Sequence, residues 1–485
     1  MRVSVIGLGY VGLVTAACLA EWGHDVLGVD ADESRLEGLG EGRLPIHEPG
    51  LPELVERGVA SGRLRFSTPS ASAVSSAQVV FVAVGTHDGA GGWQTMTIRT
   101  TIASIAPDLA DDATLVVRST LPPDFVRRLA SLVNEPRELG GQRSVAVMTN
   151  PEFTREGAAV RDFLDPDRVV FGVCDDPLGR GESMLRKVYH ATDAPVLVMS
   201  GTDAAMTKLG SNLFLATKIS FANELAQLCD AYGADVAHVV AGMSYDVRVG
   251  RGFLSAGVGF GGSCLPHQVT MTVRDSETLG ISTPLFAAVE EVNDRQRRAF
   301  VDRIIAATAG ASKPRVALLG LTFKPGTDDM REAPSLEIAR MLIEAGIRVT
   351  AYDPMEAARA RAAQIIPALA VVDRASKAIM NSDAIGIVTE WPEFGKLPWA
   401  AIAKAVRRPI IVDGRNCLDP VAMALAGFDY IGFGRSARSV PVEEAGREEA
   451  GAASVVVRER TLPTRQGYPV ERLVHRGAES RVSEA

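Results

Sequence analysis

The sequence predicts an α/β protein with two Rossmann-like, doubly wound parallel-sheet domains joined by a long central helix. Three observations predict this fold: an apolar, β-rich run leads into GLGYVG at the start, a second strand, loop, helix and strand series begins at VALLG, and a helical pattern without proline lies between them. At 485 residues the chain is too long for one hydrophobic core. We expect domains at 1–200, 201–310 and 311–436, and a disordered, highly charged tail at 437–485.

The first strand, VSVIG, is followed at once by the GLGYVG turn (7–12). The helix that this turn opens is expected to end near Gly23, and the next strand, DVLGVD, ends at Asp30, 18 residues after the last glycine of the turn. Strand, glycine turn, helix, strand and acid in this order predict a dinucleotide site, with the Asp30 carboxylate on the ribose 2′-hydroxyl. Because a carboxylate repels a 2′-phosphate, we expect NAD rather than NADP.

Four more apolar runs predict the rest of the first sheet, at residues 79–85, 114–120, 144–150 and 168–173. Helical stretches alternate with them, as in a parallel, doubly wound sheet. Ligands gather at the carboxyl ends of such strands. The polar segments found there are Gly85-Thr86, Ser119-Thr120 and Asn150-Pro151-Glu152.

The central helix is predicted over residues 202–232, because apolar side chains recur at spacings of three and four. Lys208 and Asn212 are four residues apart and therefore share a face of this helix. The spacing alone leaves open whether they belong to a site or to a solvated polar stripe. A helix too long for one domain to cover can also supply a dimer interface.

The second unit begins with the strand at 316–320 and repeats the plan of the first, with Asp353 in the place of Asp30. Its loop, LTFKPGTDD, lacks the glycine fingerprint. A different nucleotide, held partly by Lys324, is the simplest physical interpretation. Strands at 384–389 and 409–415 complete this predicted domain.

Composition limits the classes of function. A net charge of −8 provides no basic field for nucleic acid or an anionic membrane, so small molecules are the expected partners. We expect neither a membrane span nor a signal peptide, because glycines interrupt the N-terminal apolar run and no segment approaches ~20 apolar residues. The five cysteines lack CxxC spacing, which predicts no metal site and no disulfides and favours the cytoplasm.

The stretch GVGFGGSCLPHQVT (257–270) raises the main chemical question. A free cysteine is usually a small buried hydrophobe. The glycines before Cys264 instead let the backbone approach a ligand or adopt positive φ, as beside a reactive nucleophile. The stretch alone supports either interpretation.

Seven motifs, in order over residues 1 to about 435, resemble the UDP-glucose/GDP-mannose dehydrogenase family: GLGYVG, LPIHEPGL, NPEFTREG, SNLFLATKISFANE, GFGGSCLP, LTFKPGTDDMRE and DGRN. The FLATKISFANE helix and the GADV segment look closest to the UDP-glucose branch. The resemblance implies NAD-dependent, four-electron oxidation of the C6 alcohol of a nucleotide-diphospho-glucose to the uronate, through a Cys-bound thiohemiacetal and thioester. Covalent capture by a thiolate keeps the intermediate aldehyde from escaping, which favours Cys264 as a nucleophile.

The resemblance also implies roles for single residues. The implied catalytic residues are the nucleophile Cys264, Lys208 and Asn212 for the developing oxyanion, Thr120 and Glu152 for a water, with Glu152 as the base, and Gln268. The implied cofactor-binding residues are Gly7, Gly9, Tyr10, Val11, Gly12, Asp30, Arg35, Gly85, Thr86, Thr120, Glu156 and Arg331. The implied substrate-binding residues are Glu152, Phe153, Thr154, Glu156, Lys208, Asn212, Arg248, Phe253, Gly261, Lys324 and Arg415. Arg248 resembles an arginine that reaches a neighbouring subunit's site, which implies a homodimer.

The chain departs from the family pattern beside the implied nucleophile. His267-Gln268 stands where the family usually has Lys-Asp, and that aspartate is normally counted among the catalytic residues. Other departures are His87 for Thr-Pro, Arg118 for the lysine of KST, LPPDF for VPxGT and Gly252 for a lysine. The alternatives are therefore the same chemistry on dTDP-glucose, GDP-mannose or a UDP-N-acetylhexosamine, or a catalytically impaired nucleotide-sugar-binding relative.

Overall fold

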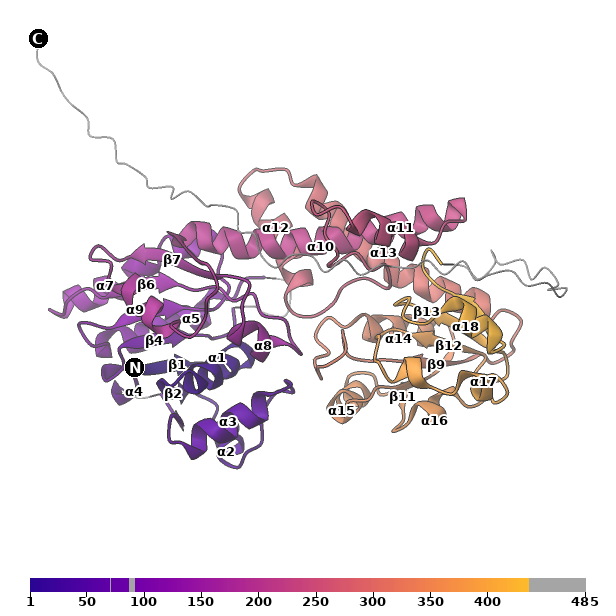
Figure 1. The fold of residues 1–485 in the computed structure, drawn as a ribbon, viewed down its shortest axis with the longest axis horizontal. Coiled ribbons are helices and arrows are strands. Elements are labelled where there is room, and N and C mark those ends of the chain that lie inside the picture. Colours follow the sequence, from indigo (N-terminus) through magenta and orange to yellow (C-terminus); the bar gives the residue numbers. More distant parts are fainter. Residues whose placement is uncertain (70, 87–91, 436–485) are drawn as a thin grey trace, which may run out of the picture. The chain divides into compact units, whose positions relative to one another are not determined.

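A computed structural model describes residues 1–69, 71–86 and 92–435. Over these residues, two β-sheets follow one another along the chain, and long helices connect them (Figure 1). The expected tail at 437–485 and the departure at His87 lie outside the described residues.

The first sheet has the strand order β3-β2-β1-β4-β5-β6-β7-β8 in the described part of the chain. Its order reverses between β1 and β4, and the carboxyl ends of these two strands therefore flank the crevice where such sheets bind ligands. All neighbours are parallel except β6 and β7. The strands are β1 (Arg2–Ile6), β2 (Asp25–Val29), β3 (Leu64–Ser67), β4 (Val79–Val82), β5 (Thr114–Val117), β6 (Ala146–Thr149), β7 (Val169–Asp175) and β8 (Val196–Ser200).

Helices cover both faces of the first sheet (Figure 1). The first of them is apolar all round because it is buried between the sheet and two other helices, α3 and α8. The helices are α1 (Tyr10–Glu21), α2 (Glu33–Gly40), α3 (Leu51–Ala60), α4 (Ala71–Ser75), α5 (Thr95–Ile105), α6 (Pro123–Val126), α7 (Leu129–Leu139), α8 (Ala159–Leu164) and α9 (Arg180–Val188), with a 3-10 turn at Ala106–Asp108.

The predicted central helix is confirmed as α10 (Gly201–Tyr232). The Ser200 hydroxyl accepts a hydrogen bond from the Asp203 N–H (3.1 Å) at its start, and Gly233 ends it with φ +72°. Its first half packs on β7 and α6, and its second half buries Ala226 and Cys229 in the core of the second sheet. The helices that follow are α11 (Val236–Ser244), α12 (Leu265–Thr278) and α13 (Pro284–Ala307).

The second sheet is parallel throughout its described strands, with the order β11-β10-β9-β12-β13-β14. Asp353 accepts hydrogen bonds from the backbone N–H groups of Leu321 (2.7 Å) and Thr322 (3.1 Å), much as Asp30 accepts one from Leu8 (2.6 Å). The elements are β9 (Arg315–Leu319), α14 (Pro334–Glu344), β10 (Arg348–Tyr352), α15 (Glu356–Ile365), β11 (Ala370–Val371), α16 (Ala375–Ile379), β12 (Ala384–Ile387), a 3-10 turn (Phe394–Lys396), α17 (Trp399–Ile402), β13 (Ile410–Asp413), α18 (Pro420–Leu425) and β14 (Asp429–Ile431).

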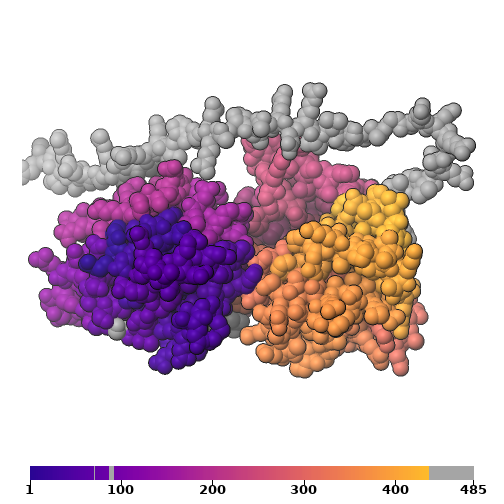
Figure 2. All heavy atoms as spheres, turned by 60° about the horizontal axis from the view of Figure 1, so that its bottom comes forward, coloured from indigo at the N-terminus to yellow at the C-terminus, as the bar shows by residue number. Residues whose placement is uncertain are grey.

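Contacts between side chains and backbone join the loops at the carboxyl ends of the two sheets. Arg331 pairs with Glu156 at 3.1 Å, and a Cβ built on Gly157 would press on the backbone of Gly326. Figure 2 draws the residues of the first sheet in indigo to magenta and those of the second sheet in orange and yellow. The motifs NPEFTREG and LTFKPGTDDMRE thus meet in space.

Candidate active site

The GLGYVG turn joins β1 to α1, and each of its glycines has a different reason to be there. Gly7 adopts φ +89°, and a Cβ on Gly12 would overlap the Gly7 carbonyl oxygen. A Cβ on Gly9 would meet nothing within 4 Å, so that position faces open space. The first N–H groups of α1 have no acceptor inside the helix, and they face that space. Open backbone at a helix N-terminus fits the pyrophosphate of a dinucleotide.

Asp30 is buried directly after β2, and its carboxylate is held by the backbone. It accepts hydrogen bonds from the N–H groups of Leu8 (2.6 Å) and Asp32 (2.9 Å), and it pairs with Arg35 Nη1 at 2.7 Å. The two side chains expected at the cofactor therefore lie together beside the glycine turn.

The segments after β4 and β5 lie at the same edge of the sheet. The Thr86 hydroxyl donates to the Thr120 carbonyl (2.8 Å), and the Ser119 hydroxyl donates to the Val84 carbonyl (2.6 Å). A Cβ on Gly85 would meet nothing within 4 Å. The structure thus brings Gly85, Thr86 and Thr120 together next to the turn.

Cys264 is not a core thiol: it is exposed, and it lies at the N-cap of α12. The pKa of the thiol lies above its usual value: crowding by protein atoms on its other sides raises it most, Lys208 lowers it, and Glu152 and Glu156 raise it. Because one face of the thiol stays open to solvent, its thiolate loses less hydration than a fully buried one would. The N-terminus of α12 also favours the thiolate.

The glycine-rich loop before Cys264 is packed against protein rather than open to a ligand. Gly259 and Gly262 adopt φ of +93° and +83°, whereas a Cβ on Gly257 or Gly261 would overlap the carbonyl oxygen of Gly414 or Glu332. Buried amide side chains hold the loop backbone: the Gly257 N–H donates to Asn223 Oδ1 (2.8 Å), the Phe260 N–H donates to Asn293 Oδ1 (2.7 Å), and Gln296 Nε2 donates to the Gly257 carbonyl (2.9 Å). Close packing fixes the position of Cys264.

Lys208 is not part of a solvated stripe: its ammonium lies 3.0 Å from Glu152 Oε1, and both side chains are buried. The other oxygen of Glu152 accepts from the Thr154 N–H (2.7 Å) and hydroxyl (2.6 Å). Burial raises the pKa of Glu152, but Lys208, Thr154 and Arg118 outweigh it, so the pKa lies below its usual value. Glu152 is therefore a carboxylate at neutral pH.

Asn212 shares the Lys208 face, and its Nδ2 donates to Gln268 Oε1 at 2.9 Å. Both side chains are buried, and Gln268 lies one turn after Cys264 on α12. The departure from the usual aspartate is therefore inside the site. His267 is half-buried on the first turn of α12.

A cluster of charges lies where the loops of the two sheets meet. Arg331 pairs with Asp329 (2.6 Å) and with Glu156 (3.1 Å). Burial, together with Asp329, raises the pKa of Glu156 to about 8, against the effect of Arg331. Burial lowers the pKa of Lys324, which Glu156 and Glu48 oppose. These groups also affect the Cys264 thiol, so the cluster belongs to the same site.

Glu48 belongs to the LPIHEPGL motif, and the sequence alone assigned it no role. This carboxylate is buried, and it accepts from the N–H groups of Gly157 (2.6 Å) and Ala159 (2.7 Å) and from the Tyr10 hydroxyl. It thereby links the glycine turn to the NPEFTREG loop. The motif was visible in the sequence, but its partners are 38 to 111 residues away.

Arg415 lies among the loops after β9, β12 and β13, but backbone carbonyls occupy its donors. Its guanidinium donates to the carbonyls of Val388 (2.6 Å), Gly259 (2.9 Å) and Phe323 (3.3 Å). It therefore holds the Cys264 loop and the Lys324 loop together, whether or not it also contacts substrate.

Arg248 is not brought to this cluster within one chain. Its side chain is 86% exposed and pairs with Asp246 at 2.5 Å. Phe253, on the same loop, is exposed and adopts φ +62°, an unusual backbone for a residue other than glycine. The loop thus presents both side chains to solvent.

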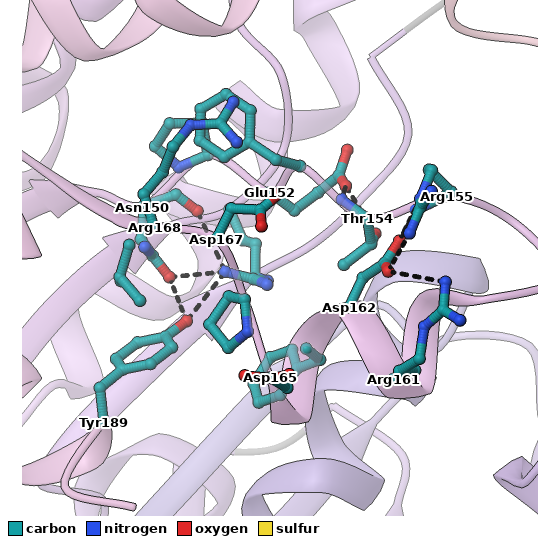
Figure 3. A pocket seen from close by; sticks show the side chains of 16 residues that line it. Asn150, Glu152, Thr154, Arg155, Arg161, Asp162, Asp165, Asp167, Arg168 and Tyr189 are labelled. Atoms are coloured by element: carbon teal, nitrogen blue, oxygen red, sulfur yellow. Dashed lines mark hydrogen bonds and ion pairs between the residues drawn. The ribbon is translucent and has the colours of Figure 1, made fainter. Parts of the chain in front are cut away.

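A polar cavity of about 240 Å³ lies beside Glu152 (Figure 3). Figure 3 shows Tyr189 and Asn150 on one side of it, and Arg155, Arg161 and Asp162 on the other. The Arg168 guanidinium stacks on the Phe153 ring at 3.8 Å, and the Lys208 ammonium lies 5.4 Å from the same ring. Arg118, which sequence analysis noted only as a departure, also lines this cavity.

Three family models match consecutive parts of the chain: the NAD binding domain of the UDP-glucose/GDP-mannose dehydrogenase family at residues 1–193, its central domain at 202–295, and its UDP binding domain at 317–420. The chain belongs to the UDP-glucose/GDP-mannose dehydrogenase family. It is an NAD-dependent nucleotide-sugar dehydrogenase, as the motifs predicted. Gly9 and the first turn of α1 are the features of this family member that fit NAD.

Relatives of this dehydrogenase cover nearly its whole described length. The UDP-glucose 6-dehydrogenase of Rhizobium meliloti is 39% identical over 441 residues, which are 90% of this chain and 100% of the relative. That of Pseudomonas aeruginosa is 40% identical over 442 residues, or 90% and 98% of the two chains. A UDP-glucose dehydrogenase structure from Pyrobaculum islandicum matches with a TM-score of 0.80 at 37% identity, covering 89% of this chain and 97% of that one.

A structure of UDP-D-ManNAc dehydrogenase from Pyrococcus horikoshii is also similar, with a TM-score of 0.77 at 27% identity and coverage of 90% and 99%. In the described part of this family member, no helix is long and apolar enough to cross a membrane. Nor do the described residues contain three or more His, Cys, Asp or Glu side chains placed to hold a metal ion.

Proposed function

We propose that the protein oxidises the C6 alcohol of UDP-glucose to the uronate with two NAD, through a thiohemiacetal and a thioester on Cys264. The observation that carries this proposal is the exposed Cys264 at the N-terminus of α12, beside the buried Lys208–Glu152 pair. The similarity to UDP-glucose 6-dehydrogenases over 90% of the chain supports UDP-glucose as the substrate.

Two oxidations precede hydrolysis. NAD, when bound, would supply the two-electron oxidant for each of them by taking a hydride from C6, and the proton of the C6 hydroxyl is released in the first. The Lys208 ammonium and the Asn212 amide stabilise negative charge that develops on the C6 oxygen. The Cys264 thiolate adds to the aldehyde carbon, which forms a C–S bond and retains the intermediate. Loss of the second hydride from that carbon leaves the thioester.

Hydrolysis needs a base that is ionised at neutral pH. Glu152 meets this condition because Lys208 and Thr154 hold its carboxylate form. We assign it to take a proton from the water that adds to the thioester, with Thr120 helping to position that water. The C–S bond then breaks, and the Cys264 thiolate is recovered.

Substrate binding is assigned to the loops that meet at the charge cluster. Lys324 and Arg415 supply positive charge for the diphosphate, and Phe153, Thr154 and Glu156 would line the sugar and nucleotide. Gly261 contributes by its close packing on Glu332, and Phe253 shares the loop of Arg248, which the dimer proposed below would carry towards the neighbouring site. Because Arg415 already donates to three carbonyls, its contribution is to place the loops as well as to add charge. Glu156 and Arg331 lie at the boundary of the cofactor and substrate regions, so we keep both roles for Glu156.

A homodimer is the second part of the proposal. Phe214, Phe221 and Leu228 are seven residues apart on α10, and they are 64%, 49% and 55% exposed. A stripe of large apolar side chains on one helix face is typical of a protein interface. A second copy of this chain would cover it and would carry Arg248 towards the neighbouring site. The cytoplasmic location expected from the isolated cysteines stays a prediction.

Counting NADH per sugar tests the chemistry. We expect two NADH for each UDP-glucose, and we expect Cys264→Ser to lose this turnover while it retains binding of NAD and of UDP-glucose, because an alkoxide is far harder to form than a thiolate. Two NADH per sugar from the serine variant at a near wild-type rate would make Cys264 structural.

A panel of nucleotide sugars separates the alternatives. The likeness to UDP-D-ManNAc dehydrogenase favours including UDP-N-acetylmannosamine beside dTDP-glucose and GDP-mannose. A higher kcat/KM for one of these would replace UDP-glucose in the proposal. Binding without any NADH would identify a catalytically impaired relative, as Gln268 in place of the usual aspartate would allow.

A further inference from the structure

Arg118 follows β5 directly and is only 5% exposed. Its Nε donates to the Thr15 hydroxyl on α1 (2.9 Å). Its Nη1 donates to Asn150 Oδ1 (2.6 Å) and to the Tyr189 hydroxyl (3.0 Å). Asn150 lies two residues before Glu152. One guanidinium thus joins the dinucleotide helix to the strand end that carries the proposed base.

The charge of Arg118 has no acidic partner within ion-pair distance among the described residues. Its hydrogen-bond partners are all neutral, and its further neighbours include the Phe163 ring, 5.1 Å away, and the buried Cys18 thiol. Burying an unpaired charge costs free energy, so a buried guanidinium is expected to interact favourably with a nearby negative group. Glu152 lines the same cavity, and Arg118 lowers its pKa.

We propose that Arg118 is a positioning residue of the dehydrogenase site, which ties the Asn150–Glu152 segment to α1 and supplies a second positive charge behind the Glu152 carboxylate. The proposal rests on Glu152 acting as the base of the proposed function. Lysine in this place has one ammonium, which cannot reach Thr15, Asn150 and Tyr189 as the planar guanidinium does. Arginine in this place therefore supplies both the bridge and the charge.

Other charged groups also face Glu152, and their effects on its pKa must be distinguished from the effect of Arg118. Lys208 pairs with it from α10, and the Cys264 thiol responds to it from α12. On the cavity side lie Asp162 on α8, with its partners Arg155 and Arg161, and then Asp165, Asp167 and Arg168. Arg161 is a matched control, since it lines the same cavity but its side chain is 71% exposed.

The test compares Arg118→Gln, Arg118→Lys and Arg161→Gln with the wild type. Loss of the buried charge raises the pKa of Glu152, so we expect the acidic limb of the kcat–pH profile of Arg118→Gln to move up by about one pH unit. Arg118→Lys should keep the wild-type limb, with a lower kcat because the bridge is lost. Arg161→Gln should match the wild type, since solvent screens its charge.

Alkylation of Cys264 by iodoacetamide provides a readout without substrate. Its rate follows the thiolate fraction, and ionisation of Glu152 appears as a second inflection in its pH profile. Arg118→Gln should move that inflection upward in the wild-type background and should have no such effect in Glu152→Gln. Melting temperatures identify variants that fail to fold. If Arg118→Gln fails to fold, Arg118→Met replaces it as the neutral variant and is compared with Arg118→Lys, which keeps the charge.

An inflection that stays in place in the neutral variants would overturn the proposal, and so would an equal shift in the Glu152→Gln background. Absence of NADH from the wild type with every sugar would instead refute the proposed function. The alkylation profile would still decide the role of Arg118 in that case.

Discussion

At the scale of single residues, the chemistry of the site depends on which side chains are in contact. Gln268 illustrates this, because the sequence placed it one turn after Cys264, but the structure adds its contact with Asn212 at 2.9 Å. A neutral amide there does not oppose ionisation of Cys264, whereas Glu152 and Glu156 already do. The same amide cannot accept a proton from water as an aspartate could.

We therefore expect Gln268→Asp to raise kcat, because a carboxylate adds general-base capacity of about 10²- to 10⁴-fold at most. The added negative charge should also raise the pKa of Cys264, so iodoacetamide should react at higher pH than in the wild type. Steady-state kcat and alkylation rates across about pH 6 to pH 9.5 measure both effects. His267→Ala serves as the control for a histidine base, and a lower kcat in Gln268→Asp would show that the glutamine is adapted to this site.

At the scale of elements, the strand–turn–helix unit β1–α1 separates folding from binding. Gly12 is needed for packing, since a Cβ there would overlap the Gly7 carbonyl oxygen, and Gly9 is not, since a Cβ there meets nothing within 4 Å. The same glycine motif therefore contains one position that the fold requires and one that is open to a ligand.

Gly12→Ala should destabilise the fold by about 1–3 kcal/mol or more, because the helix must shift from the turn. Gly9→Ala should melt close to the wild type and bind NAD more weakly, because the methyl group occupies the space for the pyrophosphate. Thermal melts and titration with NADH fluorescence distinguish the two. Equal NAD affinity in Gly9→Ala and the wild type would remove the pyrophosphate from this turn.

At the scale of the whole molecule, Glu156 connects stability to pH. The pKa of this carboxyl is about 8 in the fold, above its usual value of 4.5. The folded state therefore holds a proton that the unfolded state loses between these values, so this contribution to stability is complete below pH 4.5 and is lost as the pH rises through about 8.

Glu156→Gln mimics the protonated carboxyl, so its advantage in melting temperature over the wild type should grow from about pH 5 to pH 8. Thermal melts of both proteins across that range provide the measurement. Arg155→Gln, on the exposed side of the same loop, is the control. A constant difference between Glu156→Gln and the wild type would contradict the raised pKa.

The proposed dimer can be tested by subunit mixing. Cys264→Ser and Arg248→Ala should each be inactive, because each leaves every site incomplete. Co-refolding equal amounts should restore about a quarter of the sites, since half of the dimers are hybrids and each hybrid has one complete site. No recovery of NADH formation, with light scattering showing that hybrids form, would place Arg248 in its own subunit's site or outside any site.

The sequence by itself determined where the central strands lie along the chain, the dinucleotide turn, the central helix and the family, because these depend on local periodicity and on motifs read along the chain. The strands it did not predict, β3, β8, β11 and β14, are the four edge strands of the described sheets. β3, β11 and β14 are too short to show an apolar pattern, whereas β8 (VLVMS) is apolar but partly exposed at the edge of its sheet. The sequence also predicted parallel strands throughout, and this was wrong for β6 and β7, which are antiparallel. The direction of pairing depends on the path of the segment that connects two strands, and the apolar pattern of a strand does not show that path. Only the tertiary structure decided that Lys208 pairs with Glu152, that Asn223, Asn293 and Gln296 hold the Cys264 loop, and that Arg118 and Glu48 join distant segments. These contacts join residues far apart in the chain, and the low dielectric that gives a buried charge its effect exists only once the chain has packed around it.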